Sequence, residues 1–169
     1  MRLRALTVAD HLPIRAVMNE WWGGRQVDHL LHRFLFEHFG DSSLFAETAE
    51  GELAGFLVGF LSQTQPDVAY VHFIGVAPSA RGSGLGRTLY QAFMAHARLA
   101  GRTRIKAITS PVNHASVAFH LSLGFRLAEG DATVNDYPVI SDHGGPGQAR
   151  ICFEIDLKAA HEAADQQGQ

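Results

Sequence analysis

Three alternating glycines between a strand-like run and a helix-like run constrain the fold of this chain more than any other feature. The strand-like run covers residues 68–76, and Gly82, Gly84 and Gly86 stand where a segment of helical periodicity, residues 85–100, begins. A helix N-terminus carries unpaired N–H groups and the positive end of the helix dipole. Glycines there let an anion reach those groups without meeting a Cβ, so phosphate is the expected ligand.

The spacing of these glycines excludes the two commonest nucleotide cradles. In the dinucleotide fingerprint G-x-G-x-x-G the third glycine would stand at position 87, which is Arg87 in this chain. The P-loop requires Gly-Lys-Ser/Thr, which does not follow these glycines. The loop therefore belongs to another class of phosphate site.

Charge and hydropathy narrow the class of partner. The chain has 169 residues, and its 14 Lys and Arg stand against 17 Asp and Glu, so no basic excess indicates a nucleic-acid or anionic-membrane surface. Its longest apolar run, residues 53–61, is shorter than the roughly 18 residues of a membrane span. Asp10 and His11 interrupt the apolar stretch that a secretory signal requires. We expect a cytoplasmic protein that contacts neither nucleic acid nor membrane.

Cysteine and histidine usage predicts no disulfide and no metal site. The single Cys152 lies in a strand-like run, where a cysteine is usually a small buried hydrophobe. His29 and His32 have helical i, i+3 spacing, but no third ligand accompanies them.

The remaining pattern predicts one mixed α/β domain over residues 1–158, followed by a polar tail, 159–169. A helix capped by Asp10 is expected to run to Glu20, and a second amphipathic helix covers 27–39. The other expected elements are a hairpin turning at Glu50-Gly51, a strand at 105–109, a helix at 113–123, a long loop at 130–148, and strands near Phe125 and Ile151. This order is a βαβ crossover attached to an antiparallel meander.

Two motifs in this chain resemble those of one enzyme superfamily. The first reads V-x-P-x-x-R-G-x-G-L-G-x-x-L and runs from Val76 to Leu89; it resembles motif A, Q/R-x-x-G-x-G/A, of the GNAT acyltransferases. The second, NHASVAFHLSLGF at 113–125, resembles motif B of the same superfamily. The order of elements also matches over nearly the whole chain. The resemblance implies a GNAT fold, with a mixed, mostly antiparallel sheet splayed between the motif A strand and the following strand, and helices on both faces.

The resemblance also implies acetyl-CoA as the acyl donor, with its pyrophosphate on the glycine loop and its pantetheine arm against the preceding strand. The residues expected to contact it are Ile74, Gly75, Val76, Arg81, Gly82, Ser83, Gly84, Leu85, Gly86, Arg87, Asn113 and Ser116. Arg81 and Arg87 fit a solvated surface equally well. Helix capping alone also explains Asn113.

Attack by an amine requires a proton acceptor, because an alkylamine with a pKa of about 10.4 is mostly protonated at neutral pH. On a strand of period two, Tyr70 and His72 share a face with the expected thioester contacts if no bulge intervenes. His72 suits a general base, and this pair stands where arylalkylamine N-acetyltransferases of the superfamily have two histidines. A core role for His72 stays open, and the rival bases are Glu20, Asp28 and Glu37.

His120 stands five positions before Phe125, where many members of the superfamily have the tyrosine that protonates the leaving thiolate. The resemblance therefore makes His120 the candidate acid or hydrogen-bond donor to the sulfur. A helix histidine pointing to solvent is the alternative.

The expected function is transfer of an acetyl group from acetyl-CoA to a primary amine of a small molecule or peptide, by direct attack in a ternary complex. Trp21 and Trp22 offer stacking and cation–π surface to the amine, one of them packing in the core, and Tyr70 completes the acceptor side. The superfamily often forms dimers, which leaves a homodimer open. The alternative is a non-catalytic acyl-CoA sensor or interaction module.

Overall fold

The structure is a computed structural model that describes residues 1–158, so the polar tail expected at 159–169 lies outside the described residues. The chain divides into two compact units. One holds Met1–Leu61 and Val71–Leu99, and the other holds Ser62–Tyr70 and the described residues from Ala100 to Lys158. Strand β4 (Val68–Val76) has residues in both units. A single domain over 1–158 stays a prediction.

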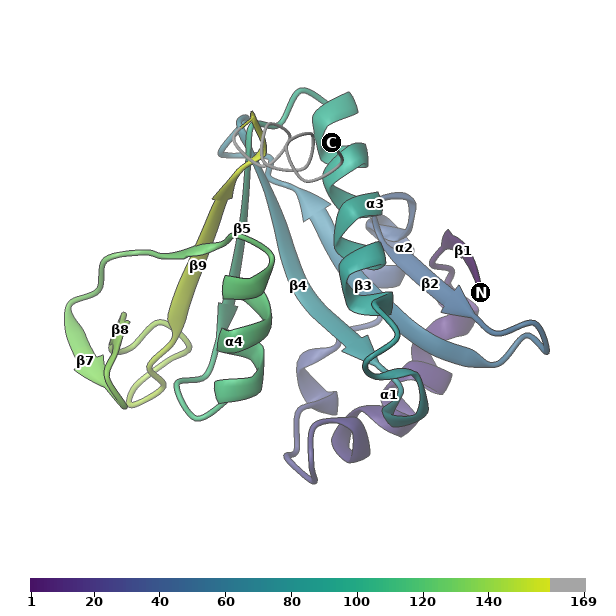
Figure 1. The fold of residues 1–169 in the computed structure, drawn as a ribbon, viewed down its shortest axis with the longest axis horizontal. Coiled ribbons are helices and arrows are strands. Elements are labelled where there is room, and N and C mark those ends of the chain that lie inside the picture. Colours follow the sequence, from purple (N-terminus) through teal and green to yellow (C-terminus); the bar gives the residue numbers. More distant parts are fainter. Residues whose placement is uncertain (159–169) are drawn as a thin grey trace. The chain divides into compact units, whose positions relative to one another are not determined.

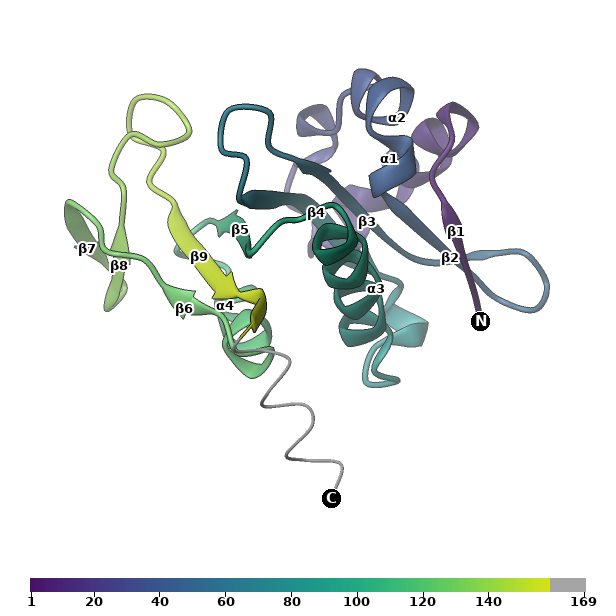
Figure 2. The same cartoon turned by 90° about the horizontal axis from the view of Figure 1, so that it is seen from above.

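The first unit is a sheet with helices on both of its faces (Figure 1 and Figure 2). Its strands are antiparallel neighbours in the order β1 (Arg2–Ala5), β2 (Leu44–Glu47) and β3 (Leu53–Leu61), followed by β4. Its helices are α1 (His11–Trp21), α2 (Phe34–His38) and α3 (Leu85–Leu99), with single 3₁₀ turns at Val8–Asp10, Asp28–Leu30, Gly40–Ser42 and Pro78–Ala80.

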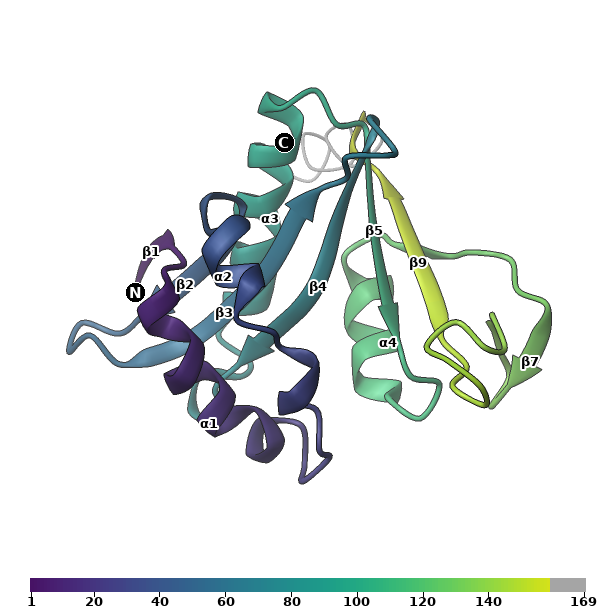
Figure 3. The same ribbon diagram turned by 180° about the vertical axis from the view of Figure 1, so that it is seen from behind.

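Neighbouring residues of β3 show how the two faces are covered. A Cβ built on Gly55 would lie 3.1 Å from Leu85 and 3.4 Å from Leu89, so α3 packs directly on this backbone. The next residue, Phe56, is fully buried on the opposite face, in the core that α1 and α2 complete. Figure 3 shows α1 and α2 in front of β2 and β3. The alternation of a strand thus separates the two helical layers.

Helix α3 confirms the predicted strand, glycine loop and helix. Its buried residues recur at three and four positions, which presents one apolar face to the sheet, and they are Leu85, Leu89, Tyr90, Phe93, Met94 and Ala97. Gly101 follows with a φ of 75°, the left-handed conformation that commonly ends a helix.

The amphipathic helix predicted over 27–39 is wrong for most of its length, because only Phe34–His38 is α-helical. Side chains of α1 hold the first part of this segment in another conformation. Asn19 Oδ1 accepts the N–H groups of Val27 (2.8 Å) and Asp28 (3.1 Å), and Arg15 donates to the Asp28 carboxylate at 2.6 Å. These contacts override the local apolar periodicity.

Asp10 also departs from the prediction. It makes no side-chain cap on α1. Its carboxylate instead accepts hydrogen bonds from Thr7 and from Arg4, at 2.7–2.8 Å. The residue stabilises the turn before the helix.

The described part of the second unit holds an antiparallel sheet, a separate two-stranded hairpin and helix α4. Its elements are β5 (Arg104–Thr109), α4 (His114–Ser122), β6 (Arg126–Leu127), β7 (Ala132–Val134), β8 (Tyr137–Val139) and β9 (Ile151–Asp156). Strand β9 lies between β5 and β6. Arg104 and Arg126 both bind the Glu154 carboxylate, at 2.8 Å and 3.1 Å, which ties the three strands together.

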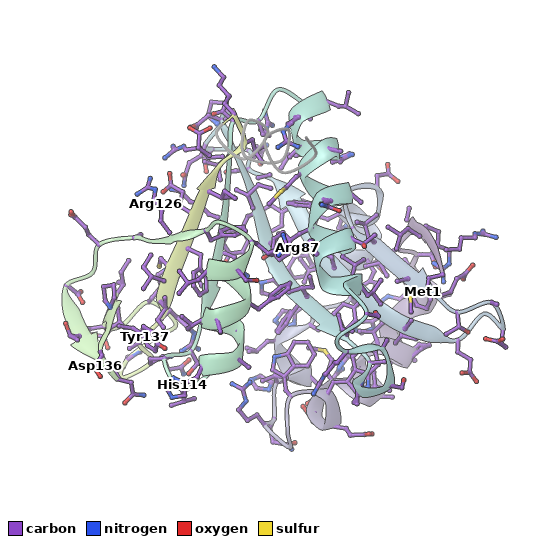
Figure 4. All side chains as sticks on the ribbon, viewed as in Figure 1. Met1, Arg87, His114, Arg126, Asp136 and Tyr137 are labelled. Atoms are coloured by element: carbon purple, nitrogen blue, oxygen red, sulfur yellow. The ribbon has the colours of Figure 1, made fainter. Side chains whose placement is uncertain are left out.

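The stretch 130–148 is not a plain loop, because β7 and β8 form a hairpin within it. Asn135 and Asp136 connect them with φ values of 51° and 65°. This conformation at both central residues is that of a type I′ turn, for which Asn and Asp are suited. Figure 4 shows Tyr137 beside His114 of α4, where the ring centroids are 5.9 Å apart. The Asn-Asp pair was the signal for this hairpin in the sequence.

The hydrogen-bonded strand order is β1-β2-β3-β4-β5-β9-β6, a mixed α/β arrangement with a mostly antiparallel sheet, as predicted. The divergence of β4 from β5 stays a prediction. Among the described residues, no helix has both the length and the apolar character that crossing a bilayer requires.

Candidate functional site

The glycine loop presents backbone N–H groups at the start of α3. The first i→i−4 hydrogen bond of the helix runs from the Thr88 N–H to the Gly84 carbonyl at 3.1 Å. The N–H groups of Leu85 and Gly86 precede this bond in the first turn, where the α-helical pattern provides no i−4 acceptor. They are donors suited to an anion.

Two glycines leave open space above this backbone. Gly82 and Gly84 have φ values of 78° and 84°, and a Cβ built on either meets no atom within 4 Å. The Ser83 hydroxyl donates to the Ala80 carbonyl at 2.7 Å, which steadies the turn. The loop can therefore be approached by a bulky anion from outside.

Arg81, expected at the phosphates, donates to two backbone carbonyls in this structure. Its Nη2 donates to the Trp21 carbonyl at 2.7 Å and its Nε to the Val76 carbonyl at 3.4 Å. Both arginines of the loop, Arg81 and Arg87, are exposed. Arg87 lies on the first turn of α3 (Figure 4).

Both tryptophans pack, although only one was expected to. The rings of Trp21 and Trp22 each lie 6.1 Å from the ring of Phe56, and Trp22 also meets Phe73 edge-on at 5.8 Å. A Cβ built on Gly75 would lie 2.6 Å from Phe56 and 3.0 Å from Trp22. The missing side chain at Gly75 thus lets this aromatic cluster lie directly on the β4 backbone. Phe56 and Phe73 were not predicted, because only tertiary contact brings them here.

His72 is bound to the segment that follows α1. Its Nε2 lies 3.1 Å from the Leu30 carbonyl, which can only accept, so this nitrogen carries the proton and neutral His72 has its lone pair on Nδ1. Burial lowers the pKa of His72, and the bond to Leu30 partly opposes that shift. Neutral imidazole is therefore the form present at neutral pH.

The expected alternation along β4 does not hold at His72. The ring centroids of His72 and Phe73 are 4.7 Å apart. Side chains of adjacent residues on a regular strand point to opposite faces, so this contact indicates an interruption of the pleat. His72 and Phe73 both contact elements on the α1 side of the sheet.

Two of the three rival bases are already paired. Asp28 binds Arg15 and Asn19, and the Arg15 bond, followed by that to Asn19, lowers the pKa of its carboxyl. Glu37 pairs with Arg33 at 2.7 Å. Glu20 is exposed. A carboxylate held by a cation is a weaker base than neutral His72.

His120 lies in the core of the second unit, not at its surface. The side chain is 3% exposed and its ring stacks on Phe153 at 4.4 Å, with Phe125 edge-on at 5.3 Å. Its Nδ1 lies 2.7 Å from the Ser116 carbonyl, so Nδ1 carries the proton and neutral His120 has its lone pair on Nε2. Burial lowers the pKa of His120. To donate a proton from Nε2, His120 must first take one up.

Asn113 caps α4, as one of the two alternatives predicted. Its Oδ1 accepts the Ser116 N–H at 3.3 Å, and its Nδ2 donates to the Thr109 hydroxyl at 3.2 Å. The cap fixes the start of the helix that carries His120. A contact of Asn113 or Ser116 with the coenzyme stays a prediction.

Tyr70 and Cys152 keep their protons at neutral pH. Burial raises the pKa of the Tyr70 phenol to about 12 and raises the pKa of the Cys152 thiol. Neither is therefore an activated nucleophile. Within residues 1–158 no three His, Cys, Asp or Glu side chains gather in a way that could hold a metal ion.

Buried His120 predicts a loss of stability in mild acid. Because its pKa is lowered in the folded protein, the unfolded chain takes up more protons below about pH 6.5, and stability falls as the pH drops toward the lowered pKa. His120→Phe keeps a ring against Phe153 and removes this uptake. We expect the variant to lose less free energy of unfolding than the wild type between about pH 7 and pH 5 in urea titrations. Equal losses would contradict the linkage.

Comparison with known proteins adds a family and a fold. The model of the acetyltransferase (GNAT) family matches residues 13–125. The chain is 34% identical over 82 residues to L-2,4-diaminobutyric acid acetyltransferase of Halomonas elongata, covering 48% of this chain and 43% of that protein. It is 33% identical over 119 residues to mycothiol acetyltransferase of Nocardiopsis dassonvillei, covering 64% and 35%. The chain thus spans less than half the length of these two relatives.

A solved structure extends the likeness to the whole fold. Diaminobutyrate acetyltransferase from Paenibacillus lautus, in complex with L-2,4-diaminobutyric acid and coenzyme A, aligns with a TM-score of 0.70. The alignment covers 92% of this chain and 94% of that chain at 20% identity. At this identity the likeness establishes the fold.

Proposed function

The chain belongs to the GNAT acetyltransferase family, and we propose from this premise that it transfers an acetyl group from acetyl-CoA to a primary amine of a small molecule or peptide. The observation that carries the proposal is the glycine loop. Its N–H groups precede the first hydrogen bond of α3, and the space above Gly82 and Gly84 is open. A diphosphate suits this backbone because it accepts several N–H donors at once. Acetyl-CoA supplies an electrophilic thioester carbonyl and a thiol leaving group.

His72 is the proposed general base. Its lowered pKa keeps it neutral, and its bond to Leu30 directs the proton to Nε2 and leaves Nδ1 as the acceptor. An acceptor amine with a pKa of about 10.4 has to lose a proton before it attacks. His72 takes this proton directly or through water. The amine then attacks the thioester without an acyl-enzyme, since neither Cys152 nor Tyr70 is ionised.

His120 is proposed to handle the proton that the leaving thiolate needs. Nε2 of neutral His120 carries no proton, so His120 donates to the thiolate only after it has taken up a proton from solvent, to which His72 releases the proton it removed from the amine. The thiol of coenzyme A has a pKa near the about 8.5 of a free thiol. Protonation of its thiolate therefore needs only modest assistance. If His120 has this role, His120→Phe should lower turnover while the affinity for the coenzyme stays unchanged. Unchanged turnover would remove His120 from the mechanism.

The acceptor is proposed to be a small amine, with L-2,4-diaminobutyrate first in the panel, since a relative and a structural neighbour carry it in their names. The experiment measures thiol release from acetyl-CoA with diaminobutyrate, polyamines, arylalkylamines and peptide N-termini. A thermal-shift titration with coenzyme A runs beside it. Coenzyme stabilisation without thiol release for any amine would favour the sensor module. The homodimer stays a prediction, which a molar mass from light scattering would test.

Replacing His72 is expected to change the pH profile of the reaction. For the wild type we expect kcat/KM to fall in acid with an apparent pKa below the about 6.5 of an exposed histidine, because burial lowers the pKa of the base. His72→Gln is expected to lose this acidic limb and about 100-fold of its rate. The exposed His38 provides a matched control, His38→Gln, which should retain the limb. An unchanged limb in His72→Gln would place the base elsewhere.

A further inference from the structure

We propose that Arg81 is a positioning residue that connects the coenzyme loop to Trp21 and Trp22, which are expected on the acceptor side, and that its guanidinium is not a phosphate ligand. This inference rests on the proposed function, because it concerns how coenzyme binding affects the amine site. The evidence lies in four contacts, all within Met1–Leu61 and Val71–Leu99.

The first contact completes the C-terminus of α1. A helix ends with carbonyls that have no partner inside it, and the helix dipole makes this end negative. The N–H groups of Gly23 and Gly24 serve the carbonyls of Glu20 and Asn19, at 2.9 Å and 2.7 Å. The carbonyl of Trp21, the last residue of the helix, accepts from Arg81 Nη2 at 2.7 Å. A cation is the favoured partner at this end.

The second contact joins the same guanidinium to β4. Its Nε donates to the carbonyl of Val76, the last residue of that strand, at 3.4 Å. Arg81 itself directly precedes Gly82. One planar side chain therefore meets the ends of α1 and β4 from the first position of the loop, and a guanidinium can donate in two directions at once, whereas an ammonium offers a single point charge.

The third and fourth contacts extend from α1 to the sheet. Trp22 covers Gly75, at 3.0 Å from the position of a Cβ there, and meets Phe73 edge-on. Trp21 stacks on Phe56. Because these rings are closely packed, a shift in the backbone of Trp21 cannot occur without moving them. The position of the loop is thus coupled to the aromatic cluster beside β4.

Coenzyme binding should therefore order the amine side through Arg81. A diphosphate bound to the loop would hold Arg81, the residue directly before Gly82, in place, and through its bond to Trp21 the end of α1. This coupling is reciprocal, since a ligand that improves the binding of a second ligand is itself bound better in its presence. Removal of the guanidinium should uncouple the two sites and leave the N–H donors of the loop intact.

The intrinsic tryptophan fluorescence of the chain can be used to measure this coupling. The chain contains two tryptophans, Trp21 and Trp22, and both stand at the junction. Their emission is recorded while the full-length protein is titrated with acetyl-CoA, and coenzyme affinity is measured independently by calorimetry. The variants are Arg81→Met, which removes both hydrogen bonds, and Arg81→Lys, which keeps the charge. Arg25→Met is the matched control, because Arg25 donates to the neighbouring Trp22 carbonyl at 3.1 Å without belonging to the loop.

Three results are expected for Arg81→Met. Coenzyme Kd stays within about threefold of wild type, and the coenzyme-induced change in emission is lost. KM for the amine of the panel that gives thiol release rises about tenfold, as for one lost charged hydrogen bond. Arg81→Lys is expected to have the same coenzyme Kd as Arg81→Met. It is expected to recover only part of the coenzyme-induced change in emission. Arg25→Met keeps the emission change.

Other results would overturn the proposal. A rise of tenfold or more in coenzyme Kd for Arg81→Met, recovered by Arg81→Lys, would make Arg81 a phosphate ligand. Binding by the wild type without any emission change would show that the junction does not respond. If the wild type binds no coenzyme, the proposed function fails. The positioning role of Arg81 is then tested by comparing the tryptophan emission of the ligand-free wild type and Arg81→Met. Red-shifted, more quenchable emission in Arg81→Met would support that role, and unchanged emission would end it.

Discussion

Gly84→Ala is expected to weaken the binding of acetyl-CoA by about 100-fold or more, which corresponds to the loss of one or two charge-assisted hydrogen bonds. The added Cβ would occupy the open space above the loop, where a diphosphate has to approach the N–H groups at the start of α3. The φ of 84° at this position adds backbone strain of about 1–2 kcal/mol. Calorimetric titration with acetyl-CoA measures the effect.

Gly51→Ala is a closely matched control for this prediction. Gly51 has a φ of 85°, and a Cβ there also meets no atom within 4 Å, but it lies in the turn between β2 and β3. Both variants should lose a similar free energy of unfolding, and only Gly84→Ala should lose coenzyme affinity. Equal coenzyme affinity in the two variants would remove the loop from the binding site.

Gly75→Ala is expected to lower the free energy of unfolding by about 2–3 kcal/mol through overpacking. Its Cβ would lie 2.6 Å from Cε1 and 3.0 Å from Cζ of Phe56, a ring with no exposed surface. The same Cβ would lie 3.0 Å from the Trp22 ring, so it cannot move away from Phe56 in that direction. Urea denaturation gives the loss in stability, and tryptophan emission should shift in the same variant because Trp22 is displaced.

A double-mutant cycle identifies the cause of that loss. Phe56→Leu removes most of the ring that the new methyl group would meet and carries a large cost of its own, about 1–3 kcal/mol. Once this change is present, adding Gly75→Ala should cost clearly less than it does in the wild type. Additive costs would show that Phe56 is not the obstacle.

The strand, loop and helix around the glycines could be predicted from the sequence because every signal for them is local. A short run rich in β-branched and aromatic residues indicates β4, glycines break the chain at 82 and 84, and a 3.6-residue period defines α3 up to Gly101. Each signal lies within the element that it specifies. The same locality made the motif recognisable, and the family followed from it.

Other segments could not be predicted, because distant residues decide their conformation. The apolar spacing at 27–39 is that of a helix, yet Asn19 and Arg15 bind Val27 and Asp28 and leave helix only at Phe34–His38. The hairpin at 132–139 is a partial exception: its Asn135-Asp136 turn is a local signal that a loop assignment overlooks.

For the candidate site, residue types followed from the sequence and states of ionisation from the fold. A histidine at 72 and another at 120 are visible in the sequence, but their protons are placed by the carbonyls of Leu30 and Ser116 and their pKa values by burial. One of the two backbone partners of Arg81, Trp21, is 60 positions away in the chain.

A strand, a glycine turn and a helix can be read from residues 68–100 alone, because backbone conformation in such a segment depends on neighbours within one or two turns. The side chains that meet beside that turn are set by the folded chain, among them Arg81 with Trp21, and Gly75 beneath Trp22 and Phe56. Side-chain contacts across the chain arise from close packing in three dimensions, and packing has no signature in local periodicity.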